Sequence, residues 1–304
     1  MNDLVAQIHE ELERKNAVLL AHNYQRPEVQ DAADITGDSL ELSIKASHTD
    51  ARMIIFCGVH FMAESAAILS PDKQVVLPRF EAGCPMADMI DGPSLVAWKK
   101  DHPDAAVVTY VNSSAEVKAL SDICCTSANA VTVVRSLSQK KIIFTPDKNL
   151  ASWVARHVPE KEIIPWNGYC PTHQKLTPDE VLLAKRRYPN ALVMVHPECR
   201  PEVVDLADAV KSTSGMLTFT SQSDAVEFLV GTEIGLLHPL SKLNPEKKFY
   251  PIKETMVCPN MKLTTLPDIL SALKNPGRST VRVPDDIRQK AKAALDRMLE
   301  IPKD

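Results

Sequence analysis

The 304-residue sequence lacks several features, and each absence excludes a class of protein. No apolar run approaches the roughly 20 residues that a helix needs to span a bilayer. With 35 basic and 39 acidic side chains the net charge is −4, so no basic surface predicts nucleic-acid binding. Residues 1–16 are charged and amphipathic, which predicts a helix and not a secretion signal. We therefore expect a cytoplasmic protein that binds neither membranes nor nucleic acids.

The sequence also lacks any CxxC pair, although it contains seven cysteines. An odd number of cysteines without a secretion signal indicates a reducing compartment with free or metal-bound thiols. Cys84, Cys170 and Cys258 are spaced 86 and 88 residues apart, and each is followed by proline. Three such thiolates would suit an iron–sulfur cluster with one incompletely ligated iron, or a zinc ion with an open position. The spacing alone fits three buried core thiols equally well.

What the sequence does contain is one stretch that occurs three times, at 17–39, 105–127 and 191–213. Each copy has an apolar run, polar residues, a Glu-Val pair and an aspartate. The aspartates are Asp34, Asp122 and Asp208. The repeat indicates three units of under ninety residues, and units of that size bury only about 60–65% of the surface of their unfolded chain, so we expect them to pack on one another. We expect units at 1–84, 85–170 and 171–258, with the tail 259–304 packing back on the first.

Strands that alternate with helices predict βαβ units and parallel sheets. The predicted class is therefore α/β, with three pseudo-threefold-related α/β/α units and small parallel sheets around a central active-site cavity. Strands are expected at 17–22, 53–59, 74–78, 107–111, 141–145, 162–166, 192–196, 216–220, 235–239 and 248–252. Helices are expected around Val29, from Asp38 or Ser39, at 115–120, at 201–209 and from about Pro284 to Glu300.

Polar residues recur at matched positions where the first strand of each copy ends. They are His22, Tyr110 and His196, followed two residues later by Tyr24, Asn112 and Glu198. A lone histidine there is more often structural, but matched polar positions favour a site, because ligands of parallel sheets bind beyond the strands' carboxyl ends. Ser39, Ser127 and Thr213, with Ser212 beside the last, precede expected helices. They are either plain N-caps or anion contacts, and together the positions predict a polyanionic ligand.

Five segments carry a resemblance to a known family: AHNYQRPEVQDAADITGDSLELS, VTYVNSSAEVKALSDICCTSANA, HPEC, GTEIGLLHPL and CPNMKLTTL. They resemble the bacterial and archaeal quinolinate synthases, from about residue 17 to the last helix. The resemblance implies a [4Fe–4S] cluster on Cys84, Cys170 and Cys258, with the fourth iron open to substrate. It also implies condensation of iminoaspartate with dihydroxyacetone phosphate to quinolinate, phosphate and water, for NAD biosynthesis. A functional link to an aspartate-oxidising enzyme would follow.

The resemblance further implies which residues line the site. We expect catalytic roles for Glu198, His196, Tyr24 and Tyr110. Substrate contacts are expected from His22, Ser39, Phe61, Asn112, Ser127, His173, Ser212 and Thr213. Some members of the family carry extra cysteines before the last ligand, but this chain has Thr255 and Ile252 there, so no disulfide switch is expected. Two alternatives stay open: a non-catalytic sensor of a dicarboxylate or phosphate ester, and a zinc lyase using the same three cysteines.

Overall fold

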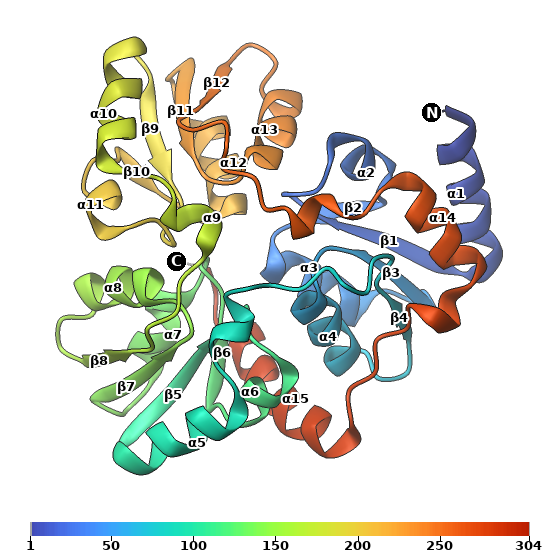
Figure 1. Ribbon diagram of the computed structural model, residues 1–304, viewed down its shortest axis with the longest axis horizontal. Helices are drawn as coiled ribbons and strands as arrows, with labels where there is room; N and C mark the ends of the chain where they lie inside the picture. Colours follow the sequence, from blue (N-terminus) through green and yellow to red (C-terminus); the bar gives the residue numbers. More distant parts are fainter. Residues whose placement is uncertain (1, 304) are drawn as a thin grey trace.

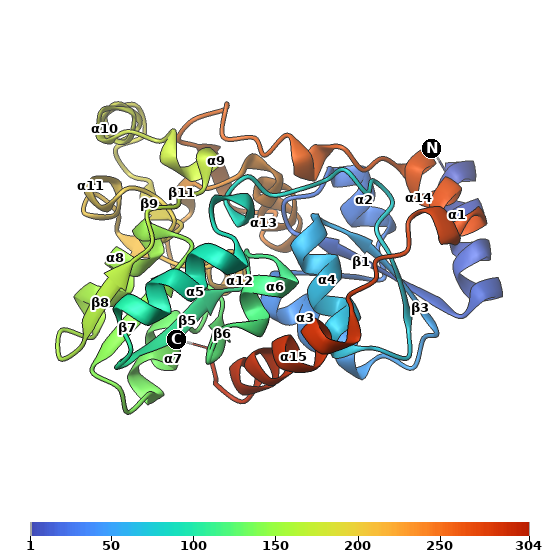
Figure 2. The ribbon, with the colours of Figure 1, turned by 60° about the horizontal axis from the view of Figure 1, so that its bottom comes forward.

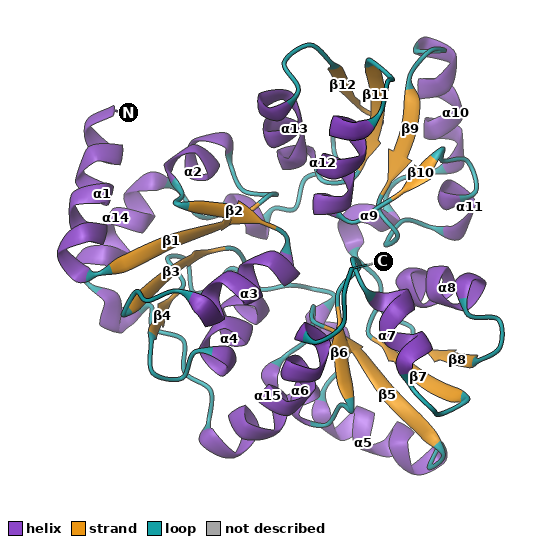
Figure 3. Ribbon diagram, turned by 180° about the vertical axis from the view of Figure 1, so that it is seen from behind, coloured by secondary structure: helices purple, strands orange, loops and turns teal. Residues whose placement is uncertain are grey.

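Three four-stranded sheets, one in each of three lobes, surround a common centre (Figure 1). The structure is a computed structural model and describes residues 2–303. Every strand pair in the three sheets is parallel. The strand orders are β2-β1-β3-β4, β6-β5-β7-β8 and β10-β9-β11-β12, which is one order used three times (Figure 3). The predicted α/β class with three repeated units is therefore confirmed.

Each lobe begins with a helix and then alternates strands with helices. The first contains α1 (Asn2–Lys15), β1 (Ala17–His22), α2 (Pro27–Ala32), β2 (Ile35–Gly37), α3 (Ser39–His48), β3 (Met53–Cys57), α4 (His60–Leu69) and β4 (Gln74–Val76). The second contains η1 (Ala87–Met89), α5 (Gly92–Asp101), β5 (Ala105–Tyr110), α6 (Ala115–Ala119), β6 (Ile123–Cys125), α7 (Ala130–Ser136), β7 (Lys141–Thr145), α8 (Lys148–His157) and β8 (Glu162–Pro165).

The third lobe repeats this order. It contains α9 (Pro171–Gln174), α10 (Pro178–Arg187), β9 (Leu192–Val195), α11 (Pro201–Val204), β10 (Ala209–Val210), α12 (Thr213–Gln222), β11 (Glu227–Gly231), η2 (Ile234–Leu236), α13 (Leu237–Leu243) and β12 (Lys248–Pro251). The sheets thus fall within the expected units 1–84, 85–170 and 171–258. Those exact domain boundaries remain a prediction.

The repeated aspartates do the same structural work in every lobe. The Oδ2 atoms of Asp34, Asp122 and Asp208 accept hydrogen bonds from the backbone N–H groups of Leu19, Val107 and Val193, at 2.8, 2.7 and 2.8 Å. Each aspartate's own N–H donates to the carbonyl of the same strand residue. The short second strand is thereby tied to the first, which explains why the repeat contains an aspartate at this position. These carboxylates hold the fold and do not line the central cavity.

Replacing Asp122 with alanine is expected to lower the free energy of unfolding by about 1–3 kcal/mol. The change leaves the N–H of the buried Val107 without its carboxylate acceptor, and an unpaired buried donor costs roughly that much. Urea denaturation followed by circular dichroism measures the change. Asp224→Ala, which removes an exposed carboxylate, is the control. Equal stabilities of the two variants would contradict the structural role.

Two expected strands in the third lobe are wrong. Residues 216–220 belong to α12, although their β-branched and aromatic residues favour a strand. The helix begins there because the Ser212 side chain accepts a hydrogen bond from the N–H of Gly215. The repeat aligns Thr213 with Ser39, which begins α3, so the repeat was a better guide than propensity.

Residues 235–239 also belong to helical segments, η2 and α13, because the Glu233 side chain accepts from the N–H of Gly235 and starts a helical turn. The third strand of this sheet is instead β11, which pairs with β9 and β12. The sequence analysis also missed the short strands β2, β6 and β10. Their two or three residues show no alternation of apolar and polar side chains that could identify them.

The tail consists of η3 (Asn260–Lys262), α14 (Leu266–Lys274), η4 (Pro276–Arg278) and α15 (Asp285–Leu299). Helix α14 lies beside α1 of the first lobe, and α15 packs on α6 and β6 of the second lobe and on α4 of the first (Figure 2). The tail therefore contacts the second lobe as well as the first. The largest apolar core follows the same path, because it joins Leu20 and Phe56 to Val108, Phe144 and Leu295.

No helix in residues 2–303 is long and apolar enough to cross a lipid bilayer.

Candidate functional site

A central cavity lies where the three lobes meet, beyond the carboxyl ends of their first strands. Its walls include every site residue expected from the sequence except Ser212. Those residues are His22, Tyr24, Ser39, Phe61, Cys84, Tyr110, Asn112, Ser127, Cys170, His173, His196, Glu198, Thr213 and Cys258. Ser212 instead caps α12 and lines a neighbouring cavity with Lys211. The fold thus brings together side chains that are more than two hundred residues apart in sequence, from His22 to Cys258.

The cavity also contains residues that the sequence analysis missed. Asp38, Val59, Thr126, Thr172 and Glu233 are among them. The sequence contains a signal for two of these residues. Val59 and Glu233 each lie two residues after the third strand of their lobe, and Asp147 occupies the same position in the second lobe. Each of these three residues is the N-cap of the next helical segment. The third strands were not aligned in the sequence, so this matched set went unnoticed.

The two histidines at the strand ends are oriented by the same local bond. Nδ1 of His22 accepts from the backbone N–H of Tyr24 at 3.1 Å, and Nδ1 of His196 accepts from that of Glu198 at 3.3 Å. The proton of each neutral ring therefore sits on Nε2. Burial lowers the pKa of both imidazoles to about 3, so both are neutral at ordinary pH. His196 Nε2 lies 3.2 Å from the Ser127 hydroxyl, within reach of a hydrogen bond between lobes.

Glu198 is the buried carboxylate at the centre of this group, with only 3% of its surface exposed. Its Oε1 accepts from the Tyr110 hydroxyl at 2.6 Å, and its Oε2 lies 2.7 Å from Nδ1 of His173. Burial raises the pKa of Glu198, but the His173 imidazole and these hydrogen bonds lower it by more, to below its ordinary value. The carboxylate is therefore ionised. Burial also raises the pKa of Tyr24 and Tyr110, so both phenols keep their protons.

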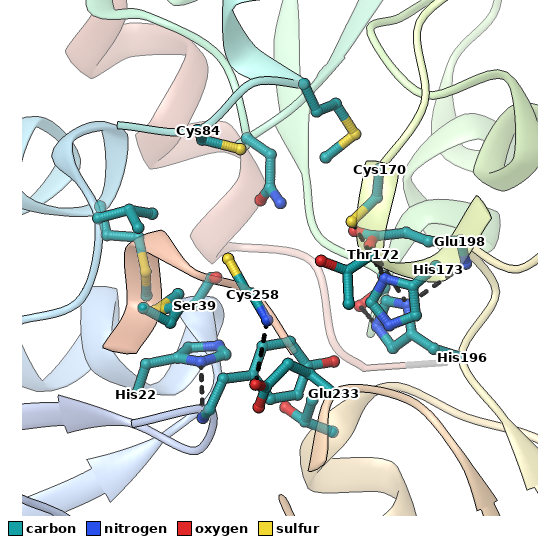
Figure 4. A pocket seen from close by; sticks show the side chains of 18 of the residues that line it. His22, Ser39, Cys84, Cys170, Thr172, His173, His196, Glu198, Glu233 and Cys258 are labelled. Carbon is teal, nitrogen blue, oxygen red and sulfur yellow. Dashed lines mark hydrogen bonds and ion pairs between the residues drawn. The ribbon is translucent and has the colours of Figure 1, made fainter. Parts of the chain in front are cut away.

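Cys84, Cys170 and Cys258 occupy equivalent loops, and their sulfur atoms point toward the middle of the cavity (Figure 4). Each cysteine is followed by proline and a short helical turn, so the next free N–H groups face the sulfur. The Cys84 sulfur accepts from the backbone N–H groups of Met86 and Ala87. The Cys170 sulfur accepts from that of His173, and the Cys258 sulfur from those of Asn260 and Met261.

A thiolate that accepts such N–H bonds is stabilised as a metal ligand. Cys84, Cys170 and Cys258 form no disulfide. Burial raises the pKa of the three cavity thiols, that of Cys84 to about 12, so they ionise only when a cation binds them. Three converging thiols with donors already aimed at their sulfur atoms fit a cluster that takes three protein ligands.

Two buried carboxylates accept hydrogen bonds from the backbone of two of the cysteine loops. Asp147 Oδ2 accepts from the N–H of Cys170 at 3.1 Å, and Glu233 Oε1 accepts from the N–H of Cys258 at 3.2 Å. Glu233 is also paired with Lys262 at 3.0 Å. The matched position in the first lobe is Val59, so the Cys84 loop has no such carboxylate. Instead Asn260, two residues after Cys258, donates to the carbonyl of Gly83 at 2.8 Å.

Neutral donors line the remaining cavity together with apolar side chains and the carboxylates of Asp38 and Glu233. Among the described residues that line it, none is lysine or arginine. Ser39 and Thr213 are the first residues of α3 and α12, where the N-caps Asp38 and Ser212 bind only the third N–H of each helix. The first two N–H groups stay outside these capping bonds and can face an anion. The buried Oδ1 of Asn112 has no hydrogen-bond partner, which indicates that a ligand supplies one.

Comparison with known proteins agrees with this geometry. The family model described as "Quinolinate synthetase A protein" matches residues 6–300. Quinolinate synthase of Thermodesulfovibrio yellowstonii is 57% identical over 301 residues, covering 99% of both chains. That of Pelobacter propionicus is 59% identical over 303 residues, covering 100% of this chain and 99% of the relative. Quinolinate synthase 1 of Methanosarcina acetivorans is 54% identical over 299 residues, covering 98% of both.

Proposed function

The chain belongs to the quinolinate synthase family, and we propose that it condenses iminoaspartate with dihydroxyacetone phosphate to quinolinate, phosphate and water. The observation that carries the proposal is the meeting of three cysteine loops with Glu198, His22 and His196 in one cavity. Membership of this enzyme family excludes the non-catalytic sensor considered above. The zinc lyase alternative is separated from our proposal by the metal that the cysteines hold.

We propose that Cys84, Cys170 and Cys258 hold a [4Fe–4S] cluster. Their convergence and the N–H groups aimed at their sulfur atoms support this donor set. With three protein ligands, such a cluster supplies one iron with an open position, which acts as a Lewis acid toward substrate oxygen. The hydrogen bonds from the backbone N–H groups of Cys170 and Cys258 to the carboxylates of Asp147 and Glu233 fix the positions of these two ligands.

The remaining residues bind anions and move protons. The hydroxyl groups of Ser39, Ser127 and Thr213, together with the free N–H groups of α3 and α12, bind the carboxylates and the phosphate. A site of neutral donors suits a substrate that must leave as product and phosphate, because no lysine or arginine has to be separated from them. The ionised Glu198 accepts protons during phosphate loss, isomerisation and ring closure. His22 and His196 donate from Nε2 to oxygen atoms on which negative charge develops.

The test is turnover of the two substrates by protein purified without oxygen, with quinolinate measured by chromatography. Iron and acid-labile sulfide are measured on the same sample, and about four of each per chain are expected. Quinolinate formation that depends on both substrates would support the proposal. Zinc in place of iron in an active sample would favour the lyase alternative, and an iron-loaded sample without turnover would reject the proposed reaction.

Replacing Glu233 with alanine is expected to weaken retention of the metal centre by about 10- to 100-fold, the usual effect of losing a group that positions a ligand. The change removes the acceptor of the Cys258 N–H and the partner of Lys262. The rate at which a chelator bleaches the anaerobic protein measures the effect. Glu227→Ala, on the preceding strand and outside the cavity, is the control. Identical bleaching of both variants would show that the Cys258 loop needs no such support.

Other features remain proposals of the same kind. The imine substrate hydrolyses in water, so we propose that an aspartate-oxidising enzyme supplies it nearby. We also propose that the protein works in the cytoplasm, where its thiols stay reduced. The proposed partners are the two small-molecule substrates, with no membrane or nucleic acid.

A further inference from the structure

We propose that Cys170, His173 and Glu198 form a second, unassigned metal site that takes Zn²⁺ when the three-cysteine centre is empty. Each of the three side chains offers one ligand atom, and these atoms lie within 4.8 Å of one another. Figure 4 shows the Cys170 sulfur beside the Glu198 carboxylate and the His173 ring. Only Cys170 is shared with the three-cysteine set. The assignment of this site rests on its own three residues and not on the proposed cluster. Its competition with the cluster does rest on that proposed function.

The ligand atoms are already close to the arrangement that zinc requires. The Cys170 sulfur lies 3.2 Å from Nδ1 of His173, and that nitrogen lies 2.7 Å from Oε2 of Glu198. Tetrahedral zinc with ordinary bond lengths places such pairs about 3.6 and about 3.4 Å apart. Each pair therefore has to open by less than about 1 Å. His173 and Glu198 are 1% and 3% exposed, so both are fixed by packing before any cation arrives.

Both non-cysteine ligands have the outer partners that metal ligands need. Nε2 of His173 lies 2.8 Å from the Thr232 hydroxyl, so it can donate its proton there while a cation replaces the proton that Nδ1 shares with Glu198. The Tyr110 hydroxyl donates to Oε1 of Glu198 at 2.6 Å, which leaves Oε2 as the ligand oxygen. The two partners hold the ligands in their orientations.

The charges and donor types select a cation of zinc's class. One thiolate and one carboxylate carry two negative charges, so a divalent cation makes the buried site neutral and avoids an uncompensated buried charge. A sulfur ligand with an imidazole favours zinc over magnesium or calcium, which prefer oxygen ligands only. The fourth position faces the cavity, where water or a substrate oxygen can complete the tetrahedron.

Occupation of this site has a direct consequence. The Cys170 thiolate belongs to both ligand sets, so zinc bound there competes with the three-cysteine centre for this sulfur. The zinc would also hold His173 and Glu198 away from the substrate. We therefore infer that zinc binding and cluster assembly compete, and that bound zinc keeps the chain in its cluster-free, inactive form.

The probe is Co²⁺, added without oxygen to the full chain after iron and sulfide have been removed by chelation. A single cobalt ion per chain should bind, with thiolate-to-cobalt absorption in the near ultraviolet and the strong visible bands of tetrahedral cobalt. Zinc should displace it and erase both signals. Cys170→Ser and His173→Gln should each abolish the spectrum, with unchanged circular dichroism showing that the variants fold. Thr232→Val should weaken binding about 10- to 100-fold, because it removes the outer partner of His173.

Cys84→Ser and Cys258→Ser are the decisive variants, because neither residue belongs to the proposed zinc site. They should bind cobalt as the unaltered chain does. Loss of binding in either would overturn the assignment and place the cation on the three cysteines, and binding that survives Cys170→Ser would also overturn it. Zinc-loaded chain should fail to turn brown on reconstitution with iron and sulfide until a chelator removes the zinc. The iron content of freshly purified protein tests the proposed cluster separately.

Discussion

Cys84→Ser is expected to give a folded chain that lacks brown colour, contains little iron and makes no detectable quinolinate. Serine preserves the shape of the side chain but offers no thiolate, so one of the three converging ligands is lost. The Cys84 loop is the one that has no carboxylate behind it, and the thiol faces the cavity directly. Iron, labile sulfide and the visible spectrum of anaerobically purified protein measure the loss. Cys170→Ser and Cys258→Ser should behave in the same way.

The matched control is Cys57→Ala, which changes a fully buried thiol in β3, away from the cavity. This variant should keep its colour and its turnover, although the small cavity that it creates will lower stability. If the Cys84 variant kept a full complement of iron, Cys84 would not be a ligand. The observed geometry of the three loops would then have to serve some purpose other than holding a cluster.

The second large effect is expected from Glu198→Gln, which should keep the metal centre and lose about 10²- to 10⁴-fold in turnover, the range for general acid–base groups. Glutamine fills the same space and can still accept the Tyr110 hydrogen bond, but it carries no charge and accepts no proton. Steady-state rates of quinolinate formation give the loss, and the visible spectrum shows that the centre is intact.

Glu202→Gln is the control, because Glu202 is exposed in the first turn of α11 and its change removes the same charge outside the cavity. The control should turn over at the ordinary rate. Near-normal turnover by the Glu198 variant, with the centre intact, would remove Glu198 from the proton-moving role. His173, whose Nδ1 lies 2.7 Å from the Glu198 carboxylate, would be the next candidate.

Much of the site follows from the sequence because the chain repeats itself. The repeat aligns His22, Tyr110 and His196, and all three line the cavity. The internal alignment could not reveal that the aspartates of the same repeat are structural, since a spacing repeated within the chain looks the same for a ligand-binding residue and for one that hydrogen-bonds the backbone. Propensity failed at 216–220, where one serine side chain begins a helix in residues that favour a strand. Ser212 itself was expected in the cavity and lies just outside it.

The sequence by itself determined the α/β class, the three units, the matched strand-end residues and the three equivalent cysteines, because each is a local pattern or a repeated spacing. Only the tertiary structure decided which groups touch. The bond from Tyr110 to Glu198, the placing of Cys170 beside His173 and Glu198, and the support of Cys258 by Glu233 join side chains through space. Such contacts depend on how three lobes pack around one centre, and spacing along the chain does not determine distances between lobes.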